Sequence, residues 1–200
     1  MANLFAGDVA AAIIGLEPIK GATVELIRID NNGDQVGAVI DTAVTSTTGD
    51  YTLTLPAGVN LAGDLVVRIT GSGSNELRAQ VVDEAVNISP VSEFILRRFI
   101  AAGADLANLE TAAVVKLSGQ VEAFDLTAGS DLNAMFEQLE FAVGEFIDSQ
   151  IDAIDIASAN ATALSGPYRS AALQIALGDN QGGGFGSFAF DMWSSCFIFS

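Results

Sequence analysis

The segment that decides the fold runs from Ala22 to Gly58 and reads ATVELIRIDNNGDQVGAVIDTAVTSTTGDYTLTLPAG. Short runs in it alternate between apolar and polar residues, as in Val24 and Leu26, which is typical of strands with one buried face. The Asn32-Gly33 pair lies between two such runs and favours a hairpin turn, because both residue types tolerate a positive φ. The segment therefore predicts a set of antiparallel strands.

A second turn and a strand end lie further along the same segment. Gly49-Asp50 predicts a turn that needs a positive φ. Tyr51 opens the next strand, and we expect its ring to be buried while its hydroxyl reaches a partner at the edge of the fold. Pro56 ends that strand, because proline cannot donate to a ladder. We expect these residues to have a structural role rather than a catalytic one.

Further short strands flank this segment on both sides. Apolar or alternating runs occur at 9–15, 64–71, 76–82 and 85–89. Together with the strands above they give about seven strands at short spacing up to about residue 90, which is typical of an antiparallel β-sandwich. Each sheet of such a sandwich is expected to bury one face.

After residue 90 the apolar period becomes helical. Pro90 and Ser92 favour a helix start, and the clearest helix has one broad apolar stripe made of Leu132, Met135, Phe136, Leu139, Val143, Phe146 and Ile147. The predicted fold is therefore β-dominated and α+β overall. Its parts are a seven-stranded sandwich over 1–90, a helical segment over 91–158, and a short β tail over 159–200 that starts a further domain or exchanges with another copy.

Residues 8–98 resemble the carboxypeptidase-regulatory-like, or transthyretin-like (prealbumin-like), β-sandwich modules of bacterial surface proteins and envelope lipoproteins. The positions that match are Pro18, Gly21, Ala22, Val24, Thr45 or Thr48, Gly49, Tyr51 and Leu53. The resemblance implies a transthyretin-like sandwich with a non-catalytic role in adhesion, display, assembly or carbohydrate contact. It also implies an extracellular or cell-envelope location.

The composition excludes several classes of function. The chain has 25 acidic and 8 basic residues and a formal net charge of −17, a field that repels nucleic acids and anionic membrane surfaces. It contains no run long and apolar enough for a transmembrane segment. Histidine is absent, which removes the commonest general base and any Ser-His-Asp triad, so we predict no enzyme. Because Met1–Gly15 has no basic start, we expect any export segment to lie outside this chain.

One weak metal pattern is present. Asp30, Asn32, Asp34 and Asp41 are spaced loosely like the ligands of a calcium loop, but the glycine, Gly33, is at the fourth position rather than the sixth. A plain hairpin turn and a calcium site are therefore both open, with the turn favoured. No other cofactor is predicted.

Three functions remain open. The first is a non-catalytic extracellular or envelope binding module that recognises a protein or a glycan at the cell surface. The alternative is a structural subunit of a surface filament or tube, assembled by calcium bridging or by strand exchange through residues 185–200 as a homo-oligomer. The third, which is the least favoured because we predict no enzyme, is a glycan hydrolase that uses paired carboxylates. The candidate pairs are Glu137 with Glu140 or Glu145, and Asp152 with Asp155.

Overall fold

The computed structural model describes residues 3–7, 18–70, 76–124 and 131–165. Contacts divide the chain into a unit over Met1–Asn160 and a unit over Ala161–Ser200. In chain order the elements are β1 (Asn3–Gly7), β2 (Thr23–Ile29), β3 (Gln35–Val44), β4 (Tyr51–Leu55), β5 (Ala62–Thr70), β6 (Glu76–Val81), α1 (Pro90–Ala101), the 3₁₀ turn η1 (Leu106–Asn108), α2 (Thr111–Glu122) and α3 (Leu132–Ser165).

The strands form two antiparallel sheets. The larger has four strands in the order β3-β2-β5-β6, and the smaller pairs β1 with β4. The alternation within β4 is complete: Tyr51, Leu53 and Leu55 are buried and the threonines between them are exposed. Their side chains share a buried cluster with Val24 and Leu26 of β2, so the two sheets enclose one apolar layer.

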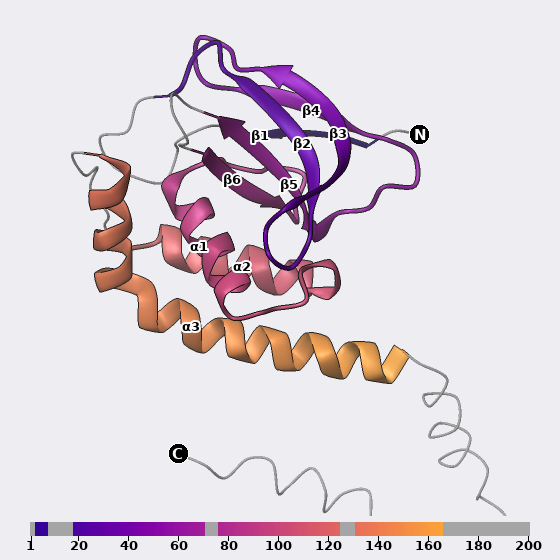
Figure 1. Ribbon diagram of the computed structural model, residues 1–200, viewed down its shortest axis with the longest axis vertical. Coiled ribbons are helices and arrows are strands. Elements are labelled where there is room, and N and C mark those ends of the chain that lie inside the picture. The colour runs from indigo at the N-terminus through magenta and orange to yellow at the C-terminus, as the bar shows by residue number, and fades with distance from the viewer. Residues whose placement is uncertain (1–2, 8–17, 71–75, 125–130, 166–200) are drawn as a thin grey trace, which may run out of the picture. The chain divides into compact units, whose positions relative to one another are not determined.

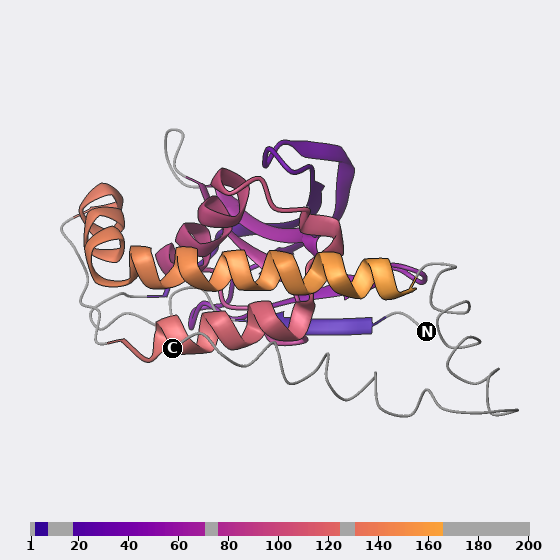
Figure 2. The same cartoon turned by 90° about the horizontal axis from the view of Figure 1, so that it is seen from below.

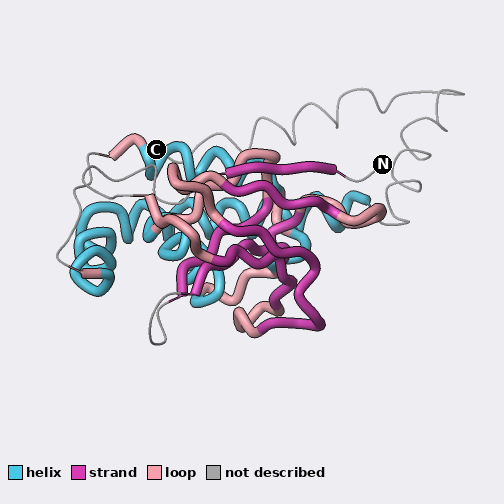
Figure 3. The backbone as a smooth tube through the Cα atoms, turned by 90° about the horizontal axis from the view of Figure 1, so that it is seen from above, coloured by secondary structure: helices cyan, strands magenta, loops and turns pink. Residues whose placement is uncertain are grey.

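The four-stranded sheet is buried on its second face as well. Ile27 and Ile29 of β2 and Val66 of β5 belong to a separate cluster together with residues of all three helices. Figure 3 shows the strands gathered together with the helices beside them. The sequence-based prediction that each sheet buries one face is therefore wrong for this sheet, because the helical segment covers the side that was expected to face solvent.

The helices follow their predicted patterns. A capping box starts α1: the Ser89 side chain accepts a hydrogen bond from the Ser92 backbone and the Ser92 side chain accepts one from the Ser89 backbone. In α3, Met135, Leu139, Val143 and Ile147 are buried, which confirms the predicted stripe. Figure 1 shows α1 and α2 against the sheet, and Figure 2 shows α2 and α3 running side by side.

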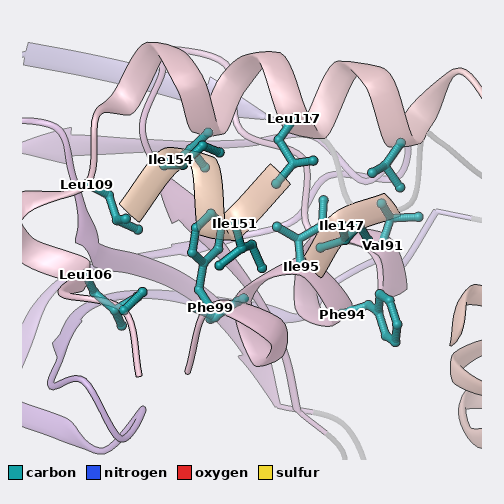
Figure 4. Close-up of a cluster of buried hydrophobic side chains, with 14 of the residues drawn as sticks. Val91, Phe94, Ile95, Phe99, Leu106, Leu109, Leu117, Ile147, Ile151 and Ile154 are labelled. Atoms are coloured by element: carbon teal, nitrogen blue, oxygen red, sulfur yellow. The ribbon is translucent and has the colours of Figure 1, made fainter. Parts of the chain in front are cut away.

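The second cluster lies between these helices and the sheet. Phe99 of α1, Leu117 of α2 and Ile147 of α3 are each at most 1% exposed. Figure 4 shows their side chains, and those of Leu106 and Ile151, directed into one shared space. Since a helix with an apolar stripe is stable only where that stripe is covered, the helical segment and the sheet depend on each other.

Several predicted boundaries are corrected. The predicted strand at 85–89 contains only isolated bridges at Ala85 and Ile88, so the described residues hold six strands and the predicted seven are not confirmed. Between α1 and α3, the segment predicted to be helical contains the short turn η1 followed by α2. The β tail predicted to start at residue 159 is helical up to Ser165, because α3 continues that far. The remaining tail and the run at 9–15 lie outside the described residues.

Candidate functional site

A network of ion pairs around the buried Glu93 holds β6 and α1 together. Glu93 of α1 is completely buried, and its carboxylate accepts hydrogen bonds from Arg78 at 2.9–3.0 Å and from Arg97 at 2.6 Å. Burial would lower the pKa of the Arg78 guanidinium, but its hydrogen bond and charge pairing with Glu93, and the charge of Glu76, raise it. The network connects β6 to α1. Its charged groups pair with one another, so they have a structural role and are not candidates for binding a ligand.

In the turn predicted as a possible calcium site, the Asp30 side chain forms hydrogen bonds within the turn itself. The Asp30 carboxylate accepts the backbone N–H of Asn32 at 2.8 Å and that of Asp34 at 3.0 Å. The N–H of Asp34 lowers the pKa of the Asp30 carboxyl, desolvation opposes this, and Asn32 adds to it. Asn31 in the same turn accepts the N–H of Leu106 at 3.1 Å. The turn therefore anchors the hairpin to the helical segment.

The fourth predicted ligand lies elsewhere. Asp41 pairs across from Leu26 in the middle of β2, whereas Asp30 follows the end of that strand. The Asp41 carboxylate accepts the N–H of Thr42 at 2.8 Å and that of Thr54 at 2.7 Å, which links β3 to β4. The structure thus does not bring the four predicted ligands together. Within the described ranges, no group of three or more His, Cys, Asp or Glu side chains is placed to hold a metal ion.

A cavity beside α1 and α2 is the candidate site, and we call it the α1–α2 cavity. It has a volume of about 240 Å³ and lies between residues 82–87, α1 and α2. Its inner lining is aliphatic and buried: Ala79, Val86, Val91, Ile95 and Val114. Its more exposed lining is mainly polar or small, with the exposed Val115 beside these residues: Asp83, Ala85, Asn87, Ser118, Gly119 and Glu122.

The walls of this cavity are held firmly. The Tyr51 hydroxyl donates to the Val86 carbonyl at 2.6 Å, which confirms the expected role of Tyr51 and fixes the segment after β6. The Ser92 hydroxyl donates to the Arg78 carbonyl, and Gln80 donates to the Gly63 carbonyl. These three lining or supporting groups are therefore used within the fold.

Glu122 is the cavity's most informative polar group. It ends α2, and desolvation raises the pKa of its carboxyl. Its residue is exposed by surface area, so the surrounding protein removes only part of its water. No described group is hydrogen-bonded or ion-paired to its carboxylate, and no lysine or arginine lines the cavity. The cavity thus has a negative mouth that nothing in the described part of the chain neutralises.

Gly119 lines the cavity on the α2 side. It lies inside the helix, where glycine costs roughly 0.5–1 kcal/mol relative to alanine. A Cβ at this position would meet no atom of the described residues within 4 Å, so packing among those residues does not require glycine here. The missing side chain leaves room for a group that approaches the helix from outside.

The acids proposed from the sequence for catalysis do not form a cleft of their own. Glu137, Glu145 and Asp155 are exposed on α3, and Glu140 pairs with Arg98 at 2.5 Å. Asp152 lines a second cavity, but the other acid there is Asp148, which pairs with Arg98, and not the predicted partner Asp155. The structure instead places Asp83 and Glu122 around one cavity, which the sequence did not suggest. Because Asp83 and Glu122 lie far apart in the sequence, their spacing gives no indication that they line the same cavity.

The segment proposed for strand exchange, residues 185–200, lies outside the described residues. Among the residues that are described, no helix combines the length and the apolar character that a membrane crossing requires.

No protein-family model matches this chain, and no curated protein matches it. Among solved structures, the chain is similar to the crystal structure of the major plantain pollen allergen Pla l 1. The sequence identity is 14%, the TM-score is 0.28, and the alignment covers 44% of this chain and 90% of that one. A TM-score of this size supports no statement about the fold or the function of this chain.

Proposed function

We propose that this protein is a non-catalytic binding module of the cell surface or envelope and that it binds its partner through the α1–α2 cavity. The observation that carries the proposal is the cavity itself: an aliphatic interior, an unneutralised acidic mouth, and an interior helical glycine that packing does not require. The resemblance to transthyretin-like surface modules supports the location and the non-catalytic role.

The size of the cavity favours binding over catalysis on a glycan. Its volume of about 240 Å³ is below the roughly 300–1,000 Å³ of pockets that enclose a drug-sized ligand. A glycosidase would also need two carboxylates on opposite sides of a sugar ring, within a groove that holds the ring. An assay of glycan hydrolysis should show no turnover, and turnover that is lost in both Asp83→Asn and Glu122→Gln would contradict the proposal.

Binding to arrays of cell-surface proteins and glycans tests the main proposal. Wild-type protein should bind at least one class of target. Gly119→Leu fills the cavity mouth and should abolish that binding, whereas the matched variant Gly119→Ala should retain it because a Cβ there meets nothing. Circular dichroism confirms that both variants fold. Full binding by Gly119→Leu would show that the cavity is not the site.

A filament subunit is the second candidate, and one observation favours it. Within the described residues, β3 lies at the edge of the four-stranded sheet with β2 as its ladder partner, and its Val36 and Val44 are 53% and 65% exposed. Such an edge can accept a strand from another copy. Size-exclusion chromatography and electron microscopy, with and without calcium, test this. A strict monomer at high concentration would exclude it.

A further inference from the structure

We propose that the α1–α2 cavity receives a lysine side chain of a partner protein, with the aliphatic stem against the cavity interior and the ammonium group beside Glu122 and Asp83. This inference rests on the binding function proposed above and specifies the chemistry of the group that enters.

The shape of the cavity fits one side chain. An engineered cavity of about 150 Å³ holds benzene, a ligand of six heavy atoms. A volume of about 240 Å³ therefore admits a long side chain but excludes a whole peptide or sugar chain. Val86, Val91, Ile95 and Val114 give the interior an aliphatic surface, and a lysine stem of four methylenes is the most extended aliphatic stem among charged side chains.

The charge of the cavity fits an ammonium group. Asp83 and Glu122 both line it, and its described lining contains no cationic side chain. The partial desolvation of the Glu122 carboxylate is not offset by any cation among the described residues, so an entering ammonium group would provide its counter-charge. Arginine matches the aliphatic interior less well, because its stem has three methylenes rather than four and its planar guanidinium is bulkier than an ammonium group.

The whole molecule favours the same class of partner. The chain has a formal net charge of −17, which attracts a basic protein surface and accelerates its approach. Gly119 lies at the mouth, where the missing side chain lets the partner backbone come close to α2.

Methyl NMR of the full chain tests this proposal with two capped amino acids that differ at the end of the stem. The probes are Nα-acetyl-lysine-N-methylamide and Nα-acetyl-norleucine-N-methylamide. We expect the lysine probe to shift the methyl signals of Ile95 and Val114 saturably, and the norleucine probe to bind at least about threefold more weakly. Equal or tighter binding of norleucine would overturn the assignment.

Variants separate a specific contact from the general negative field. Glu122→Gln should weaken the lysine probe about threefold to fivefold and leave norleucine unchanged, since a partly exposed ion pair is worth that much. Glu84→Gln is the matched control, because this exposed acid lies beside Asp83 but does not line the cavity. An equal effect of both variants would contradict the proposal.

The outcomes also distinguish this inference from the proposed function. If Gly119→Leu abolishes binding to the surface arrays but the lysine probe does not bind wild-type protein, the cavity is a binding site and the lysine assignment is wrong. If Gly119→Leu binds the arrays as the wild type does, the cavity is not the functional site and both proposals fail.

Discussion

Glu93 shows how one buried charge can decide the stability of the frame. Its carboxylate is fully enclosed and holds the guanidinium groups of Arg78 and Arg97. Glu93→Gln would leave the half-buried Arg78 with only the more distant Glu76 carboxylate, at 3.5 Å, as counter-charge. We expect this to lower the free energy of unfolding by about 3 kcal/mol. Urea denaturation followed by circular dichroism measures this change.

Glu137→Gln is the control for Glu93, because it removes an exposed acid from α3. It should change the free energy of unfolding by less than about 0.5 kcal/mol. Similar losses in the two variants would mean that the buried network does not stabilise the fold.

Glu122 should make the free energy of unfolding depend slightly on pH. The sign of this dependence is opposite to that caused by an acid in a salt bridge. Its pKa is raised above the ordinary value by desolvation, so the folded state binds this proton more tightly than the unfolded state. The contribution of the group to stability is therefore full below the ordinary pKa and is lost as the pH rises through the raised one. Glu122→Gln should be more stable than wild type near about pH 7 by less than about 1 kcal/mol after solvent screening.

The same two proteins should be equally stable near about pH 3.5, where Glu122 is protonated in both states. Thermal unfolding at the two pH values measures the difference. A variant that is less stable than wild type at neutral pH would show that the Glu122 carboxylate has a favourable partner in the folded chain.

Single residues were predictable from the sequence where local chemistry decides them. Gly49 has a φ of 89° as the turn required, and Tyr51 is buried with its hydroxyl bonded. The acids were not predictable in this way. The carboxylates of Asp30 and Asp41 accept hydrogen bonds from backbone N–H groups around them. One donor to Asp41, Thr54, lies thirteen residues away in the next strand.

Two glycines test the packing of the elements in opposite directions. A Cβ at Gly119 in α2 meets nothing, so Gly119→Ala should stabilise the protein by roughly 0.5–1 kcal/mol through helix propensity. A Cβ at Gly63 in β5 would lie 2.6 Å from the Leu106 carbonyl oxygen of η1, so Gly63→Ala should destabilise it by about 1–3 kcal/mol.

Denaturant unfolding of both alanine variants, compared with wild type, gives the two changes. The contrast in sign is the informative result, because the same substitution is made in both. Destabilisation by Gly119→Ala would show that the space above α2 is filled by the chain itself, and the cavity would lose its open side.

The existence of most elements could be read from periodicity, but their ends could not. β2 to β6, α1 and the stripe of α3 lie where alternating or helical patterns place them. The run at 85–89 has the composition of a strand, yet it connects β6 to α1 and is held by Tyr51 and by the burial of Ile88 rather than by a ladder. Tertiary contacts therefore override the local propensity there.

For the molecule as a whole, the sequence indicated a sandwich followed by helices. It did not indicate that the helices pack against the second face of the four-stranded sheet. Ile27 and Ile29 alternate with Leu26 along β2, so the strand has apolar residues on both faces. This is the mark of a strand that is covered twice. The α1–α2 cavity depends on this packing of the helices against the sheet, because α1, α2 and the chain after β6 all contribute to its lining.

The most direct test of this account is native-state hydrogen exchange of the full chain. The central claim is that the sheets and the helices over the second face form one cooperative unit that holds the cavity rigid. The slowest amides of β2, β5 and α1 should then share one opening free energy, equal to that of global unfolding. Exchange of the α1 amides at an opening free energy lower by about 2 kcal/mol or more, with β2 still protected, would contradict the claim.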